Sequence, residues 1–208
     1  MKTGRYLLPL VLLAGSAFGQ EVQRFTANFG GGFTEPVGGT GRRLDTGWNI
    51  DGGVGLNFNA WVGALVQAHL DDNSINGRTL TALGFPNGTV RLSSFTLDPV
   101  VHLNPHGKVD FYLIGGGGLY HRTQEFTQPS VAGFVGFDPF FGFYQGAVPV
   151  NQVIASYTVN KPGWNGGAGF SFGAFRSAKF YAEARYHHMF LGNDRHYDVV
   201  PVTFGIRF

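Results

Sequence analysis

Residues 179–190 read KFYAEARYHHMF, and their chemistry alternates with a period of two. One side of this stretch carries Phe180, Ala182, Ala184, Tyr186, His188 and Phe190, and the other carries Lys179, Tyr181, Glu183, Arg185 and His187. Residues 199–208, VVPVTFGIRF, alternate in the same way, with Val200, Val202, Phe204, Ile206 and Phe208 on the apolar side. Because successive strand side chains point to opposite faces, both stretches are predicted to be strands. They predict a hairpin with one apolar face and one charged face.

The same alternation predicts six earlier strands, at residues 25–34, 47–58, 62–71, 90–103, 109–126 and 164–172. The connections after the second, fourth and sixth strands are expected to be short, and those after the first, third, fifth and seventh to be longer. Residues 72–88 are predicted to be a polar loop. Residues 127–162 form the longest stretch predicted to be irregular, although residues 152–160 could prolong a hairpin. The fold prediction is all-β, an eight-stranded antiparallel up-and-down barrel.

The length of 208 residues is compatible with one domain. The chain has no cysteine, which excludes disulfides, thiol nucleophiles and thiolate metal sites. A secretory signal is predicted from Lys2 and Arg5, the apolar run at residues 6–14 and the small-x-small pattern that ends at Gly19. We expect residues 1–19 to be a cleaved signal peptide and residues 20–208 to be the barrel domain. Without Lys2 and Arg5 the basic residues fall from 15 to 13, equal to the 13 acidic residues, so nucleic-acid binding is not expected.

The apolar face is predicted to contact lipid. Its aromatic residues gather near the strand ends and predict two interfacial girdles, comprising Trp48, Trp164 and Phe190 at the loop end and Phe58, Phe172 and Phe180 at the turn end. A soluble lipocalin-like barrel is the alternative. It would place the other face in water, but that face is mostly Gly, Asn and Ser, and only 13% of the residues are charged. The alternation of short turns and longer loops also favours an outer-membrane barrel.

Two Gly-rich segments repeat within the chain. Residues 47–49 recur as residues 163–165, and residues 52–58 resemble residues 166–172. Together with the signal, the 180–187 strand and the 202–208 terminus, they make the chain resemble the OmpA/OmpX-type eight-stranded outer-membrane proteins, in the outer membrane protein beta-barrel domain family. The resemblance implies a bacterial outer-membrane location, contact with outer-membrane lipids and lipopolysaccharide, and a monomer. It also implies that the barrel-assembly machinery reads Phe204, Ile206 and Phe208 as an insertion signal.

The charged face is expected to line a lumen that side chains fill. An eight-stranded barrel has an interior just wide enough for side chains, so buried charges must pair there. The predicted lumen network comprises Asp98, Glu183, Arg185, Arg122, Lys179 and His187. A largely plugged lumen is favoured over a narrow pore.

No catalytic, cofactor or metal site is expected. His187 and His188 are adjacent on a strand and point to opposite faces, so they cannot jointly hold one ion. Eight-stranded lipid A deacylases carry a His-x-Ser pair, but here the comparable stretch, residues 188–190, ends in Phe190, which offers no nucleophile. The four glycines at residues 115–118 lie within a strand and lack the Lys and Ser/Thr of a phosphate-binding loop.

Residues 129–150 are unusually aromatic. Phe134, Phe137, Phe140, Phe141, Phe143 and Tyr144 form a candidate ligand or partner loop. An alternative is that this loop packs over the barrel mouth or lies at the membrane interface.

The functional prediction is a non-enzymatic integral outer-membrane barrel with a structural or surface-interaction role. The alternatives are a narrow OmpW-like conduit for small hydrophobic molecules and, less favoured, a lipid-modifying enzyme.

Overall fold

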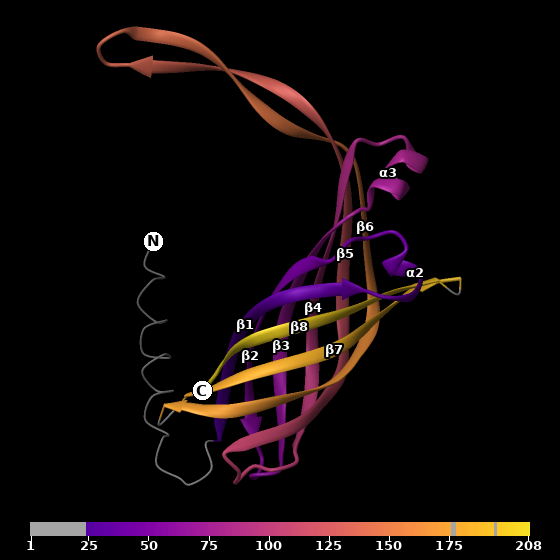
Figure 1. Cartoon of the computed structure of the whole chain (residues 1–208), viewed down its shortest axis with the longest axis vertical. Helices are drawn as coiled ribbons and strands as arrows, with labels where there is room; N and C mark the ends of the chain where they lie inside the picture. The colour runs from indigo at the N-terminus through magenta and orange to yellow at the C-terminus, as the bar shows by residue number, and fades with distance from the viewer. Residues whose placement is uncertain (1–23, 176–177, 194) are drawn as a thin grey trace, which may run out of the picture.

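The fold is a closed antiparallel barrel of eight strands (Figure 1). The computed structural model describes residues 24–175, 178–193 and 195–208, so the predicted signal peptide lies outside the described residues. The strands are β1 (Phe25–Pro36), β2 (Gly47–Asn57), β3 (Val62–Ser74), β4 (Asn87–His102), β5 (Val109–Asp138), β6 (Gly142–Phe175), β7 (Ala178–Gly192) and β8 (Arg195–Arg207). Each strand pairs with its sequence neighbours, and β8 pairs with β1. The predicted strand number and topology are confirmed.

The seam between β1 and β8 closes the wall. Their register runs from Asn28 opposite Arg207 to Pro36 opposite Val199. Beyond it, the amide of Phe208 donates to the carbonyl of Ala27 at 2.8 Å, and the amide of Ala27 donates back at 3.1 Å. Closure leaves no strand edge of the wall unpaired, which a lipid environment requires because hydrocarbon offers no hydrogen-bond partners.

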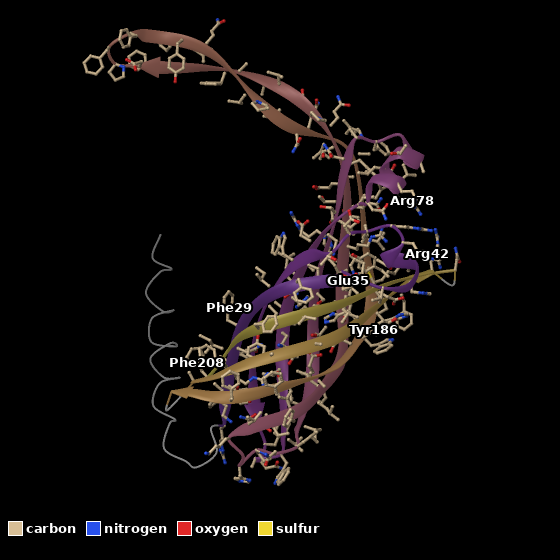
Figure 2. All side chains as sticks on the ribbon, viewed as in Figure 1. Phe29, Glu35, Arg42, Arg78, Tyr186 and Phe208 are labelled. Atoms are coloured by element: carbon tan, nitrogen blue, oxygen red, sulfur yellow. The ribbon has the colours of Figure 1, made fainter. Side chains whose placement is uncertain are left out.

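The wall has an apolar outside and a polar inside. Its outward residues include large exposed hydrophobics on every strand, such as Phe29, Val54, Phe95, Leu119 and Phe204. Figure 2 shows Phe29 and Phe208 projecting from the outside of the wall, while Arg42 and Arg78 lie toward the opposite end. The inward positions of the same strands are largely buried and polar or charged. We call the outward apolar zone of the wall the apolar band.

Two segments predicted to be loops contain short helices. Helix α2 (Gly38–Gly41) follows β1, and α3 (Gly77–Leu83) lies within the predicted polar loop at 72–88. The side chain of Asn76 caps α3 by accepting from the amide of Thr79 at 2.9 Å, and Gly84 ends the helix with φ of 76°. Asn76 and Gly84 are the two residues from which the sequence could have predicted this helix. Among the described residues, no helix is long and apolar enough to cross a membrane.

The largest departure from the prediction concerns residues 127–162, which are regular rather than irregular. β5 and β6 pair continuously to Asp138 opposite Gly142, with one irregularity at Phe126/Thr127. We call residues 127–153 the ribbon; it projects beyond the barrel and bends away from it (Figure 1). The connection from β7 to β8, expected to be one of the longer loops, is short because both strands extend to Gly192 and Arg195.

Candidate functional site

A buried ion-pair network crosses the lumen at mid-height. Arg185 on β7 donates through Nη1 to Oδ2 of Asp98 on β4 at 3.0 Å and through Nε to Oε1 of Glu183. Asp98 also accepts from Asn165 at 2.8 Å and from Thr96 at 2.7 Å. The structure thus brings together three of the six residues of the predicted lumen network. Because β4 and β7 are not neighbours in the wall, the Arg185–Asp98 pair spans the interior.

Gly116 makes room for this network. A Cβ at Gly116 would lie 2.0 Å from the carbonyl oxygen of Leu97 and 2.5 Å from Oδ1 of Asp98. No side chain fits there, so the glycine allows β4 and β5 to approach closely. This gives one member of the four-glycine run a structural role inside the strand.

A second polar layer surrounds Asp51 on β2. Oδ1 of Asp51 accepts from the hydroxyl of Tyr181 on β7 at 3.0 Å, and Oδ2 accepts from Asn28 at 3.2 Å. Close by, the guanidinium of Arg207 lies 4.5 Å from the ring centroid of Tyr112 and 5.2 Å from that of Tyr181. Aromatic faces stabilise a guanidinium by cation–π attraction. These contacts fill the lumen next to the ion-pair network with rigid side chains.

Two histidines meet across the lumen. His69 on β3 and His187 on β7 stack with ring centroids 5.0 Å apart. Nε2 of His69 lies 3.1 Å from Oδ1 of Asp71, and Nδ1 of His187 lies 3.2 Å from the hydroxyl of Tyr120. β3 and β7 are four strands apart in either direction around the eight-stranded ring, so this stack joins opposite sides of the wall.

The other two residues of the predicted lumen network lie elsewhere. Arg122 sits nearer the mouth, where Nη2 donates to Oε1 of Gln124 at 2.6 Å. Lys179 is exposed at the turn end of β7, opposite Arg207. At that end the lumen holds a pair that the sequence analysis did not single out, between Nδ1 of His102 and Oδ2 of Asp110 at 2.5 Å.

The residues predicted as girdles and insertion signal all project outward. The loop-end set Trp48, Trp164 and Phe190 and the turn-end set Phe58, Phe172 and Phe180 are exposed on the outside of the barrel. Phe204 and Ile206 on β8 and Phe208 just after it form an exposed apolar row. Trp61, in the turn after β2, is also exposed and was missed because it lies outside any alternating run.

The six residues of the predicted aromatic loop form the end of the ribbon, residues 134–144, which we call the ribbon tip. Phe134 and Tyr144 lie on one face, with ring centroids 6.0 Å apart, and Phe137 and Phe143 lie on the other, 5.1 Å apart. Phe140 and Phe141 occupy the turn and are 91% and 90% exposed. The tip therefore presents aromatic side chains in every direction.

The turn at the ribbon tip has a clear local cause. Oδ1 of Asp138 accepts from the amides of Phe140 at 2.8 Å and Phe141 at 3.0 Å, and Gly142 supplies φ of 82°. Asp138 is the only charged residue between residues 127 and 153. Its charge is therefore engaged in forming the turn that displays the two most exposed phenylalanines.

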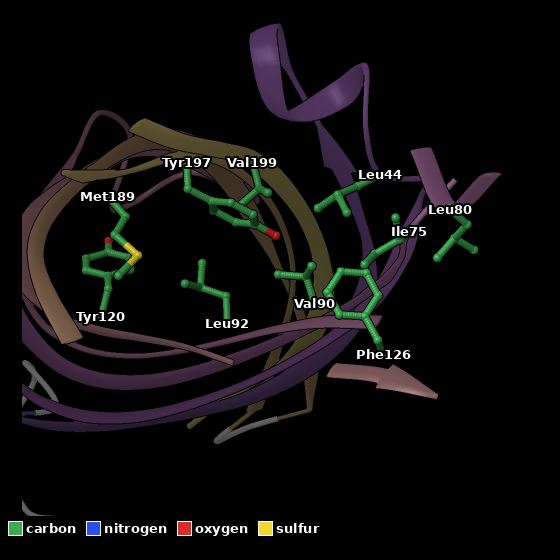
Figure 3. Packing of buried hydrophobic residues seen from close by; sticks show 10 residues of the cluster. All are labelled: Leu44, Ile75, Leu80, Val90, Leu92, Tyr120, Phe126, Met189, Tyr197 and Val199. Atoms are coloured by element: carbon green, nitrogen blue, oxygen red, sulfur yellow. The ribbon is translucent and has the colours of Figure 1, made fainter. Parts of the chain in front are cut away.

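An apolar layer closes the inner part of the mouth. It comprises Leu44, Ile75, Leu80, Val90, Leu92, Tyr120, Phe126, Met189, Tyr197 and Val199 (Figure 3). Next to this layer lies a cavity of about 740 Å³, lined by residues from α2, α3 and five strands. Sequence reasoning missed the cavity because its walls come from segments distant in the chain.

Two polar groups at this cavity lie beyond the apolar band. Burial lowers the pKa of Arg122; the nearby Tyr197 opposes that shift and Arg43 adds to it. Burial also raises the pKa of Tyr197. The Tyr197 hydroxyl therefore stays protonated and available as a donor at neutral pH.

The His188 side chain points outward and pairs with an acid. Its Nδ1 lies 2.7 Å from Oδ1 of Asp198, and Nε2 of His196 lies 3.2 Å from Oδ2 of the same carboxylate. The ring of Phe190 packs 4.7 Å from that of His188. Within the described residues no cluster of three or more His, Asp or Glu side chains is arranged to hold a metal ion.

Comparison with known proteins gives a likeness in structure only. No protein-family model and no curated protein matches the chain. The crystal structure of Neisserial surface protein A (NspA) matches with a TM-score of 0.57 and 13% identity, over 88% of this chain and 95% of that one. Ail, the attachment invasion locus protein of Yersinia pestis, matches with a TM-score of 0.50 and 19% identity, over 88% and 97%. A major outer membrane protein from Thermus thermophilus matches with a TM-score of 0.56 and 11% identity, over 88% and 97%.

These likenesses and the apolar band define the class of protein. The chain is a transmembrane β-barrel with the OmpA-like, eight-stranded fold of bacterial outer-membrane proteins. More particularly, its barrel resembles those of NspA and Ail. The predicted fold class and outer-membrane location are confirmed, and the exposed apolar band is the surface that a lipid-facing wall requires.

Proposed function

We propose that this protein is a non-enzymatic surface-interaction barrel whose ribbon tip contacts a lipid surface. The observation that carries the proposal is the exposure of aromatic side chains on both faces and at the end of the ribbon tip. The ribbon extends 11 residues beyond Thr127, about 36 Å at about 3.3 Å per residue. The barrel anchors the chain while the ribbon reaches outward.

The distribution of aromatics favours lipid over a protein groove. A strand pair that docks in a groove needs one apolar face, whereas this tip is apolar all round. Within the described chain, the outer backbone edges have no partner strand beyond Thr127 on β5 and before Gly163 on β6. Unpaired backbone groups are costly in hydrocarbon, so the contact is shallow, at the interface where aromatic side chains are favoured.

The charge of the ribbon specifies the kind of lipid. It has no Lys or Arg to attract anionic headgroups, and Asp138 is engaged by the turn. We therefore expect binding to zwitterionic bilayers that is insensitive to salt, because screening weakens only charge-dependent contacts.

The test uses the full barrel in nanodiscs and phosphatidylcholine liposomes in a flotation assay. Phe140→Ser combined with Phe141→Ser should reduce liposome association at least tenfold. Burial of one phenylalanine contributes about 1.5–3 kcal/mol, and about 1.4 kcal/mol is a factor of ten. Tyr157→Ser removes an exposed aromatic residue outside the ribbon and should leave association unchanged. Equal flotation of the parent and the double variant, or loss of flotation of the parent in high salt, would contradict the proposal.

A closed lumen is the second part of the proposal. Its support is the set of side chains that join non-adjacent strands, above all the His69–His187 stack across the ring. Planar-bilayer recordings of the parent should show no stable unitary current. Stable currents in the parent would argue for a pore.

The conduit for small hydrophobic molecules remains the alternative, favoured by the apolar-lined cavity at the mouth. The charged layers beneath it oppose apolar transit, because a buried ion pair offers no apolar path. Uptake of an apolar compound by cells that express the parent should match uptake by cells that lack it, and faster uptake would favour the conduit.

An unchanged lipid A profile on overexpression is expected for a protein without catalysis, and an altered profile would favour an enzyme.

A further inference from the structure

The cavity at the mouth is bounded by several parts of the fold. Its walls include Thr40 and Leu44 near α2, Thr79 and Leu83 of α3, and Val90 of β4. The volume of about 740 Å³ lies within the range of about 300–1,000 Å³ that is usual for small-molecule sites. It is large enough to hold a ligand rather than a single water.

Its polar lining has one sign of charge. Arg43, Arg122 and Arg195 line the cavity, and among the described residues no Asp or Glu does. None of the ion pairs among the described residues involves any of these three arginines. Arg122 is half-buried, and its guanidinium lies 5.4 Å from the ring centroid of Tyr197. Its Nη2 donates to Gln124, and the other N–H groups of a half-buried guanidinium without a carboxylate can donate charge-assisted hydrogen bonds to an anion.

A second polar group points to the same ligand. Tyr197 is only 4% exposed, it lines the cavity, and its hydroxyl has no hydrogen-bond partner within the described chain. Figure 3 shows this hydroxyl directed toward Val90, another wall residue. A buried hydroxyl without a partner costs free energy, and an anionic oxygen accepting from it removes that cost.

The remaining lining is apolar. Leu44, Ile75 and Val90 are buried members of the apolar layer, and Leu191 and Val159 pack against it. Arg43 and Arg195 are exposed, so they form a charged rim above an apolar floor. A charged rim with an apolar floor is complementary to a molecule that has an anionic head and a hydrocarbon chain.

We propose that this cavity binds a single-chain anionic amphiphile of the fatty-acid class. The carboxylate lies between the Arg122 guanidinium and the Tyr197 hydroxyl, and the alkyl chain lies along Leu44, Ile75 and Val90. Arg43 and Arg195 add long-range attraction for the anion. The site is independent of the ribbon tip, so it stands whether or not the tip contacts lipid.

The test measures dodecanoate binding to the full barrel in phosphatidylcholine nanodiscs by titration calorimetry, with empty nanodiscs subtracted. Arg122→Gln should raise the Kd at least tenfold, and Tyr197→Phe should raise it several-fold. Arg91→Gln is the matched control, because Arg91 pairs with Asp72 and does not line the cavity. Heat-dependent electrophoretic mobility verifies that each variant is folded.

Further probes identify what the site recognises. Dodecan-1-ol has the chain without the charge and should bind at least tenfold more weakly than dodecanoate. Acetate has the charge without a long chain and should show no measurable binding. Dodecyl phosphate separates a carboxylate from a phosphate headgroup, and binding tighter than that of dodecanoate would overturn the fatty-acid assignment. Equal affinity of the parent and folded Arg122→Gln, or of dodecanoate and dodecan-1-ol, would overturn the site itself.

Discussion

Replacement of Arg185 by methionine is expected to destabilise the barrel more than any other single change in the lumen network. Arg185 lies between Asp98, with side-chain exposure of 0%, and Glu183, with 3%. Removing one partner of a buried ion pair costs about 3–5 kcal/mol, because the remaining charge is uncompensated. Arg185→Met leaves two such carboxylates, so we expect a loss of about 4–5 kcal/mol in the free energy of unfolding.

The two carboxylates are affected differently. Asp98 keeps its hydrogen bonds from Asn165 and Thr96, whereas the cation that remains near Glu183 among the described residues is Arg207, at 3.8 Å. We therefore expect neutralisation of Glu183 to restore more stability than neutralisation of Asp98. The triple change Asp98→Asn, Glu183→Gln and Arg185→Met removes all three charges of this cluster and should cost less than about 2 kcal/mol, since neutral side chains often replace buried ion pairs with little loss.

The assay is urea unfolding in phosphatidylcholine vesicles, followed by the fluorescence of Trp48, Trp61 and Trp164. Heat-dependent mobility provides an independent measure of the folded fraction. Arg185→Lys keeps the positive charge but lacks the planar guanidinium that donates to both carboxylates, so it should give an intermediate loss in the free energy of unfolding. A loss below about 1 kcal/mol for Arg185→Met, or a triple variant as unstable as the single one, would refute the reasoning about uncompensated charge.

Three further predictions concern the wall. Gly116→Ala should destabilise the barrel by about 1–3 kcal/mol in the same unfolding assay, because its Cβ would overlap the carbonyl oxygen of Leu97. Gly117→Ala is the control and should cost less, because the nearest atom to its Cβ would lie 3.3 Å away. Equal losses in the two variants would contradict the role assigned to Gly116. Leu97→Arg should cost about 2–4 kcal/mol, as expected for a charge on the lipid face near the bilayer centre, and a neutral effect would argue against lipid contact there. Phe208→Ala should slow assembly by the purified barrel-assembly machinery but not spontaneous refolding in vesicles, and equal slowing of both would assign Phe208 to wall stability instead.

Much of the wall could be predicted from the sequence because lipid and lumen impose opposite chemistry on alternate residues. Phe180 and Glu183 show the two outcomes on one strand. The proximity of Asp98, Glu183 and Arg185 was also predictable, since few charges lie at mid-height and buried charges must pair. Arg122 and Lys179 could not be placed in this way, because alternation gives the face of a residue but not its height or its partners.

The ribbon and the mouth escaped prediction for different physical reasons. In the ribbon, Phe137 and Phe134 lie on opposite faces, so both faces are apolar and no period-two signal exists. The cavity depends on Arg43 and Arg122 meeting across segments far apart in the sequence, which only the closed ring determines. Helix α3 does have a local signal in Asn76 and Gly84, but a short polar segment with these residues is equally typical of a loop.

The ribbon also differs from the wall in its tolerance of evolutionary change. Beyond Thr127, β5 pairs with β6, and no other strand of the described residues fixes its length. Adding or deleting one residue on each strand keeps the two strands in register and leaves the barrel untouched. In the wall, by contrast, a one-residue slip would turn every lipid-facing side chain inward. Sequence drift and length variation between related proteins should therefore accumulate in the ribbon rather than in the wall.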